Sequence, residues 1–182
     1  TYHLFFKNIE ELKVYGNYFE GTYAQVYADS IIFDDTSDYG ATGNVVIENN
    51  EFVNICQYAI VFWDYCDVQL KVVGNKFKNC GVDGANDGYI RAVVTLVLAQ
   101  LKNENTTVLV EKNEMENVDA LVRVQYANMT AEKVNVGVKD NIFISWAEPQ
   151  PITNNGEGKE ALINAEYNYF GQEVTDESFK GV

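Results

Sequence analysis

The sequence predicts an all-β fold, a parallel β-helix of about six coils, and three observations predict it. The first is a short motif that recurs along the chain and contains an asparagine. The second is a set of apolar positions at fixed distances from that asparagine. The third is that these positions alternate with period two, as in a strand, and not with the period of a helix. The six asparagines of the motif are Asn17, Asn50, Asn75, Asn113, Asn141 and Asn168.

Two apolar columns precede the asparagine in every copy. Five residues before it stand Leu12, Val45, Leu70, Val108, Val136 and Ile163, and three before it stand Val14, Ile47, Val72, Val110, Val138 and Ala165. Positions two residues apart lie on the same face of a strand. Each unit is therefore predicted to open with a β-strand that buries one face.

The distance between successive asparagines varies while the motif itself does not. The spacings are 33, 25, 38, 28 and 27 residues, so the insertions are predicted to be loops. Units of this length that repeat predict a solenoid. Period-two patterning excludes helical solenoids, and the spacing of leucine-rich repeats is absent. A coil of about three short strands is the remaining architecture.

The asparagine is predicted to lie at a bend, because Asn tolerates left-handed backbone angles better than other non-glycine residues. Its amide both donates and accepts hydrogen bonds, so stacked copies can form an internal ladder. Two residues later comes a column that is predicted to stack inside the coils. Its members are Phe19, Phe52, Phe77, Met115, Phe143 and Phe170.

Second strands are predicted over 24–33, 59–65, 90–99 and 121–127, and a third strand would return to the next coil. Turn-forming residues stand four positions after the motif asparagine, at Gly21, Asn54, Asn79, Asn117 and Ser145. Residues 5–8 resemble residues 100–103, so we expect the chain to enter part-way through a coil of a longer protein. Residues 1–171 are predicted to form one β-helix domain, and 172–182 a C-terminal tail.

Composition limits the classes of partner. The net charge is −14, which argues against nucleic acid, because phosphates require basic patches. The 47% hydrophobic content, with 12 Tyr and 10 Phe, argues against disorder. No apolar run is long enough to span a membrane. Three cysteines without CxxC spacing predict buried free thiols and neither a disulfide framework nor a zinc site.

The motif resembles those of the right-handed parallel β-helix repeat proteins, with a pectate-lyase-like superfamily fold. The final residues 164–171, Asn-Ala-Glu-Tyr-Asn-Tyr-Phe-Gly, are similar to the endings of many cell-surface β-helix proteins of low-GC Gram-positive bacteria. The resemblance implies a secreted or cell-surface location. Such proteins include pectate lyases, polygalacturonases, phage tailspikes and adhesins, and fold alone does not choose among them.

No set of residues predicts catalysis. Glu111 and Glu166 stand on the first strand about 9.6 Å apart by coil rise, with Lys139 between them, which we interpret as a charge ladder and not as a glycosidase pair. The polygalacturonase motifs are absent, and the single histidine, His3, lies outside the repeats. Neither Arg91 nor Arg123 has an obvious acidic cluster beside it in the sequence.

Two groups of residues are candidates for binding. The acidic turn with Asp34, Asp35 and Asp38 is the best candidate for Ca²⁺, a hard cation that prefers oxygen ligands. A second acidic turn, 81–88, fails the EF-hand pattern. Trp63, Asp64, Tyr65 and Tyr126 form the candidate ligand platform, because Tyr126 stands at the same offset from its asparagine as Trp63 and sugars stack on flat aromatic rings.

The sequence therefore favours a non-catalytic extracellular segment that acts as a rigid display scaffold or an adhesin-like binding surface. Its partner would be a polysaccharide or another cell-surface glycan or protein, and no cofactor other than Ca²⁺ is expected. One alternative is part of a polysaccharide lyase or glycoside hydrolase whose catalytic coils lie elsewhere. A second alternative is a component of a phage tailspike or surface filament.

Overall fold

The computed structural model describes residues 2–6, 9–21, 29–34, 41–64, 66–82, 91–98, 107–126, 135–154 and 163–180. These residues form three sheets, in which every strand pair is parallel. Within the described residues, the only helix is a short 3₁₀ turn, Asp176–Ser178. The chain is therefore nearly all-β, as predicted.

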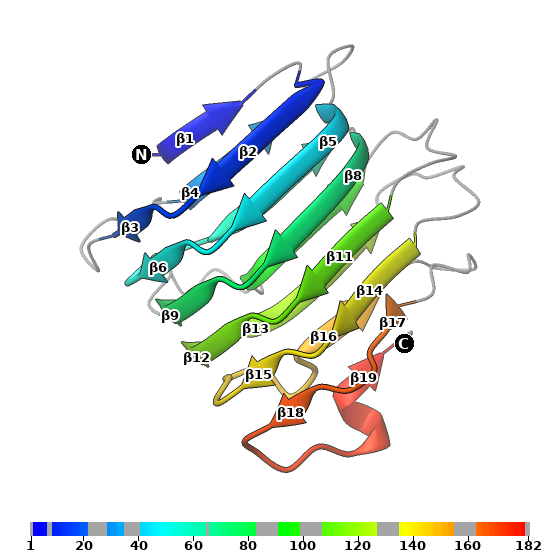
Figure 1. The fold of residues 1–182 in the computed structure, drawn as a ribbon. Coiled ribbons are helices and arrows are strands. Elements are labelled where there is room, and N and C mark those ends of the chain that lie inside the picture. The colour runs from blue at the N-terminus through cyan, green and yellow to red at the C-terminus, as the bar shows by residue number, and fades with distance from the viewer. Residues whose placement is uncertain are drawn as a thin grey trace.

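Each sheet collects the equivalent strand of successive coils (Figure 1). Sheet B contains β2 (Glu11–Tyr15), β5 (Ala41–Glu48), β8 (Cys66–Val73), β11 (Thr107–Glu111), β14 (Asn135–Lys139) and β17 (Ile163–Asn164). Sheet C contains β3 (Tyr18–Glu20), β6 (Glu51–Val53), β9 (Lys76–Cys80), β12 (Glu114–Val118), β15 (Ile142–Phe143) and β18 (Tyr169–Phe170). Sheet A contains β1 (Tyr2–Phe6), β4 (Asp29–Asp34), β7 (Ile60–Asp64), β10 (Ala92–Leu98), β13 (Ala120–Tyr126), β16 (Ile152–Asn154) and β19 (Phe179–Lys180).

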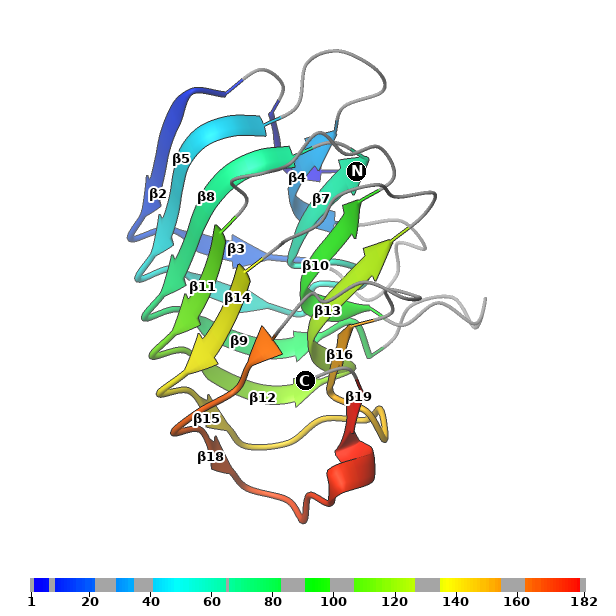
Figure 2. The same ribbon diagram turned by 90° about the vertical axis from the view of Figure 1, so that its right-hand side faces the viewer.

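One coil runs from sheet B through sheet C to sheet A, and six such coils follow β1. Figure 2 shows the three sheets enclosing a common interior. The result is a right-handed parallel β-helix of six coils, which confirms the predicted fold class. Because every neighbouring strand comes from the preceding or following coil, the fold is held together by pairing between coils.

The predicted interior columns are buried, except that Leu12, Ala165 and Phe170 in the first and last coils are only partly buried. Ile47, Val72 and Val110 in sheet B are fully buried, and so is Phe52 in sheet C. Aromatic rings of the sheet C column stack coil on coil, with centroids 4.9 Å apart for Phe19–Phe52 and 4.8 Å for Phe52–Phe77. This spacing is close to the ~4.8 Å distance between paired strands, so stacking follows from the strand repeat.

Sheet A contains a second aromatic stack that the motif alignment did not predict. Phe6, Phe33 and Phe62 are register partners in β1, β4 and β7. The centroid distance is 5.4 Å for Phe6–Phe33 and 4.1 Å for Phe33–Phe62. The interior of the first coils is therefore filled by aromatic columns from two sheets.

The asparagine ladder is present and runs along the whole solenoid. The Asn75 Oδ1 accepts from the main-chain N–H and from Nδ2 of Asn50, at 2.9 and 3.0 Å. The Asn75 Nδ2 donates to Asn113 Oδ1 at 3.0 Å and to the carbonyl of Ile47 at 2.9 Å. Equivalent side-chain links join Asn17 to Asn50, Asn113 to Asn141 and Asn141 to Asn168.

The left-handed residue at this bend is not the ladder asparagine. The prediction that the asparagine itself adopts left-handed backbone angles was therefore wrong. Positive φ falls on the preceding residue, at Gly16, Asn49, Gly74, Lys112, Asp140 and Tyr167. The side-chain N–H groups of the ladder asparagine donate to main-chain carbonyls, and its side-chain oxygen accepts from a main-chain N–H of the preceding coil. Its role is hydrogen bonding in the interior, and the preceding residue makes the bend.

The predicted turn formers four residues later form a second, shorter ladder. Asn54, Asn79 and Asn117 have φ of 56°, 54° and 51°. The Asn79 Nδ2 donates to Asn54 Oδ1 at 2.9 Å, and the Asn117 Nδ2 donates to Asn79 Oδ1 at 2.7 Å. The Ser145 Oγ then accepts from the Asn117 main-chain N–H at 2.8 Å. This turn connects sheets C and A.

The predicted second strands are in fact the third strands of each coil. The segments predicted over 24–33, 59–65, 90–99 and 121–127 overlap β4, β7, β10 and β13 of sheet A. The strand directly after the asparagine is a sheet C strand of two to five residues, too short to show its own period. Phe5 and Phe6 pair with Ile32 and Phe33, which places β1 in sheet A, whereas residues 100–103 lie outside the described residues.

The segment expected to be a tail contributes a strand. After β18, a 3₁₀ turn over Asp176–Ser178 is capped by Thr175, and β19 then pairs with β16. The Phe179 ring meets Phe170 edge-on at 5.6 Å. Residues 172–180 thus complete the sixth coil.

Candidate functional site

The predicted aromatic platform is a packed corner in the structure. Trp63, on the outer face of sheet A, is partly buried and meets Tyr58 edge-on, with centroids 5.5 Å apart. Ile32, Tyr58 and Val61 are buried beside it. Tyr65 and the side chain of Asp64 lie outside the described residues. Part of the Trp63 ring is therefore used for packing.

The register does not place Tyr126 beside Trp63. Trp63 pairs with Val97, and Val97 pairs with Gln125, so Tyr126 falls in the column of Asp64. Four residues separate Ile55 from Ile60 at this corner of coil two, but three separate Val118 from Val122 in coil four. Because this corner is one residue shorter in coil four, the residue equivalent to Trp63 is Gln125. Tyr126 has the same sequence offset from its asparagine as Trp63 but lies one position further along the strand.

The predicted calcium site stays a prediction. Asp35 and Asp38 lie outside the described residues, as does the side chain of Asp34. Among the side chains that the structure does describe, no three of His, Cys, Asp and Glu gather as a metal site.

The predicted charge ladder on sheet B is present in part. Glu111 and Lys139 are register partners, and Lys139 contributes to lowering the pKa of Glu111. The first cause of that lowering is a hydrogen bond from Lys112, whose Nζ lies 2.9 Å from Glu111 Oε1. Glu166 lies beyond the end of β17. The arrangement places cations around Glu111, which does not favour a general acid there.

No acidic cluster stands beside Arg91 or Arg123 in the sequence, but the structure places two carboxylates near these arginines. Asp119 lies at the turn before β13, and its Oδ2 accepts from the Arg91 main-chain N–H at 2.7 Å. A Cβ on Gly81 would approach the Cβ atoms of Arg91 and Asp119 within 3.1 Å. A glycine at this corner therefore allows Arg91, which is 5% exposed, to pack against Asp119.

Glu148 is the second carboxylate of this charged corner. Burial raises the pKa of Asp119, and the hydrogen bond from Arg91 and the charges of Arg91 and Arg123 oppose the rise. Burial and the charge of Asp119 raise the pKa of Glu148, whereas Arg123 lowers it. Two carboxyls that hold protons more tightly than usual, beside arginines, can take part in acid–base chemistry as well as in ion pairing.

A shallow pocket of about 320 Å³ lies beside this corner. Glu148, Pro149 and Gln150 line one side, and Thr175, Glu177 and Ser178 line the other. The pocket lies between the turn after β15 and the 3₁₀ turn of the last coil. It brings the proline-containing segment 148–150 next to the turn 175–178, a neighbourhood that no sequence pattern indicated.

His3 has partners that the sequence did not reveal. Its Nδ1 lies 3.2 Å from the Ser30 Oγ, and its Nε2 lies 3.1 Å from the carbonyl oxygen of Glu20. Ser30 is fully buried, so its hydroxyl is not open to a substrate. These contacts join β1, β3 and β4, and we interpret His3 as a structural residue of the first coil.

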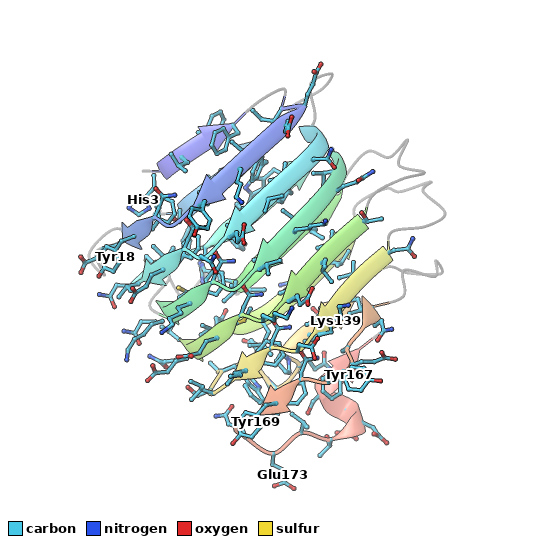
Figure 3. All side chains as sticks on the ribbon, viewed as in Figure 1. His3, Tyr18, Lys139, Tyr167, Tyr169 and Glu173 are labelled. Atoms are coloured by element: carbon cyan, nitrogen blue, oxygen red, sulfur yellow. The ribbon has the colours of Figure 1, made fainter. Side chains whose placement is uncertain are left out.

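Four tyrosines project from the outer faces near the corner between sheets B and C. Tyr15, Tyr18, Tyr167 and Tyr169 are 58%, 57%, 81% and 64% exposed. Figure 3 shows Tyr18 near one end of the solenoid and Tyr167 and Tyr169 near the other. Tyr18 and Tyr169 open β3 and β18, so they occupy the same position of different coils.

No family model matches this chain, and no curated protein or solved structure matches it. Within the part of the chain that the structure describes, no helix is long and apolar enough to cross a membrane. The function is therefore inferred from the surface of the solenoid itself.

Proposed function

We propose that this chain is a non-catalytic segment of a secreted or cell-surface β-helix protein, and that it acts as a rigid scaffold displaying a carbohydrate-binding surface. The observation that supports the proposal is the group of four exposed tyrosines, 57–81% accessible, on or beside the stacked strands. An exposed tyrosine offers a flat apolar face and a polar hydroxyl, which suits a sugar ring with its hydroxyl groups. A scaffold of paired coils holds such rings at fixed positions.

The resemblance to pectate-lyase-like β-helix proteins supports the extracellular setting, and so does the similarity of residues 164–171 to cell-surface proteins of low-GC Gram-positive bacteria. The net charge of −14 favours neutral or basic partners over polyanions. The Trp63 corner would be a secondary contact, because its ring is already partly packed.

The test is binding of the 182-residue chain to a panel of immobilised polysaccharides, with Tyr15, Tyr18, Tyr167 and Tyr169 replaced together by Ala. We expect the wild type to be retained and the fourfold variant to lose retention. The matched control replaces Ile142 and Ile144, exposed aliphatic residues of the same surface, by Ala. Equal retention of wild type and fourfold variant would contradict the proposal.

A second candidate function is hydrolysis or elimination on a polysaccharide, and the charged corner favours it. Asp119 and Glu148 have raised pKa values beside Arg123, and Glu148 borders a pocket. A protonated carboxyl can act as a general acid. Release of reducing ends or of unsaturated sugar from the same panel, abolished in Glu148→Gln, would support this candidate.

A further inference from the structure

The corner between sheets B and C is hollow over the first three coils. A groove of about 340 Å³ lies on the outside of the ladder turn there. It is lined by Gly16, Asn17 and Tyr18 of the first coil, Asn49, Asn50 and Glu51 of the second, and Gly74 and Lys76 of the third. The groove therefore follows the solenoid axis across three neighbouring coils.

The left-handed residue of each turn helps to form the floor of the groove. In the first three coils this residue is Gly16, Asn49 or Gly74, whereas the last three have Lys112, Asp140 and Tyr167. No atom lies within 4 Å of where a Cβ on Gly16 would stand. At Gly74 a Cβ would lie 2.5 Å from the Asn49 Oδ1, so the Asn49 amide extends over that glycine. The two glycines thus leave a floor that a side chain as long as that of Lys112 or Tyr167 would cover.

The chemistry of the groove is mixed. Glu51 and Lys76 are register partners in β6 and β9, which places an acidic and a basic side chain on neighbouring coils. The Asn49 amide adds a donor and an acceptor. Tyr18 stands at the end of the groove with 57% of its surface exposed, and Tyr15 precedes the same turn. A planar ring beside one acidic side chain, one basic side chain and one amide suits a ligand with many hydroxyl groups.

We propose that this groove binds a neutral polysaccharide chain lying along the solenoid axis, with a sugar ring stacked on Tyr18 and hydroxyls bound by Asn49, Glu51 and Lys76. Coils repeat at about 4.8 Å, similar to the length of one sugar residue in an extended chain, so successive sugars would meet successive coils. A polyanion is disfavoured by the net charge of −14. This inference rests on the proposed carbohydrate-binding function and assigns it to one site.

The experiment is affinity electrophoresis of the 182-residue chain through gels containing mannan, xylan, galactan or β-glucan, with polygalacturonate as the acidic comparison. Tyr18→Ala removes the ring. Gly16→Lys fills the floor with the residue type that Lys112 already supplies at a φ of 56°. Asn49→Lys is a second filling variant at a position that is already non-glycine. Ile142→Ala is the matched control, since it removes an exposed side chain from the same position of the fifth coil, outside the four tyrosines. Thermal unfolding verifies that each variant folds.

We expect retardation of the wild type by at least one neutral polysaccharide and about a tenfold loss of affinity, the equivalent of one stacking contact, in Tyr18→Ala. Both filling variants should lose binding, and Ile142→Ala should keep it. If the wild type binds but the folded groove variants bind equally well, the groove assignment is wrong while the carbohydrate-binding function stands. Retardation by polygalacturonate alone would also overturn the assignment. If the wild type binds none of the five polysaccharides, both proposals fail.

Discussion

At the scale of single residues, the ladder asparagines do the most for the fold. Asn50, Asn75, Asn113 and Asn141 are at most 2% exposed, yet each satisfies its amide through neighbouring coils. A buried polar group without a partner is costly, so removing one amide affects the turns on both sides.

Replacement of Asn75 by Ala should therefore be strongly destabilising. It leaves the Asn50 main-chain N–H without its acceptor and removes the Asn75 side-chain donor to the Ile47 carbonyl and to Asn113 Oδ1. At about 1–3 kcal/mol for the orphaned N–H and about 1 kcal/mol for each of the other hydrogen bonds lost, we expect the free energy of unfolding to fall by roughly 3–6 kcal/mol. Urea unfolding measures it. Asn17→Ala, at the exposed end of the ladder, is the control and should cost much less; equal losses would contradict the ladder's role.

Cys80 should be inert in the folded protein. Burial raises the pKa of its thiol to about 12, and its Sγ lies 3.7 Å from the Phe52 carbonyl oxygen. The thiolate is the reactive form, so a buried neutral thiol reacts slowly. In a variant with both Cys56→Ser and Cys66→Ser, we expect no labelling of Cys80 by a thiol-specific disulfide reagent at pH 8 until urea unfolds the chain. Rapid labelling of the native protein would show that the Cys80 environment is not as described.

Asp119 should make stability depend on pH in a particular direction. Its pKa is raised in the folded protein, so the folded state binds its proton more tightly than the unfolded chain does. The free energy of unfolding then falls as pH rises from the ordinary Asp pKa of about 3.9 through the raised pKa of the folded state. Relative to Asp119→Asn, the wild type should lose free energy of unfolding as pH rises from about 4 to about 7. A difference that is constant or grows with pH would contradict the assigned shift.

At the scale of the strands, the interior depends on stacking between equivalent positions. Phe52 is fully buried between Phe19 and Phe77, whereas Phe170 in the last coil is only partly buried. The outer position next to Phe52 in the same strand, Glu51, is exposed. One side of each short sheet C strand is thus core and the other is surface.

Phe52→Ala should cost about 3–5 kcal/mol of unfolding free energy, because truncation leaves a cavity in the middle of the stack. Phe170→Ala serves as the control and should cost less, since that ring is partly exposed already. Chemical denaturation of both variants measures the difference. A larger loss in Phe170→Ala would mean that the last coil, and not the centre of the stack, limits stability.

The strands also show how far the sequence could predict the fold. Sheet B and the Phe column were predictable, because their positions keep a fixed distance from the asparagine in every copy. Equivalent positions in sheet A could not be predicted from sequence offsets, because the turn from sheet C to sheet A varies in length. Trp63 therefore lies in the column of Val97 and Gln125, and not in that of Tyr126. The charged corner was not predictable, since Arg91, Asp119 and Glu148 come from three different coils.

At the scale of the whole molecule, the surface changes from one end to the other while the interior repeats. The ladder turn is hollow beside Gly16 and Gly74, and it carries long side chains at Lys112 and Tyr167. Sheet C has the Lys78–Glu116 ion pair, at 3.0 Å, in its middle and exposed Ile142 and Tyr169 toward the last coil. A repetitive core with a varied surface is the arrangement expected of a scaffold that displays binding groups.

Stacked coils, joined by the asparagine ladder, hold this surface rigid. Hydrogen–deuterium exchange of asparagine side-chain amides, followed by nuclear magnetic resonance, tests this rigidity most directly. We predict strong protection of the amides of Asn50, Asn75, Asn113 and Asn141. Asn44 and Asn164, exposed on sheet B, should exchange as in an unfolded chain. Exchange of the ladder amides at the rate of Asn44 and Asn164 would contradict the account.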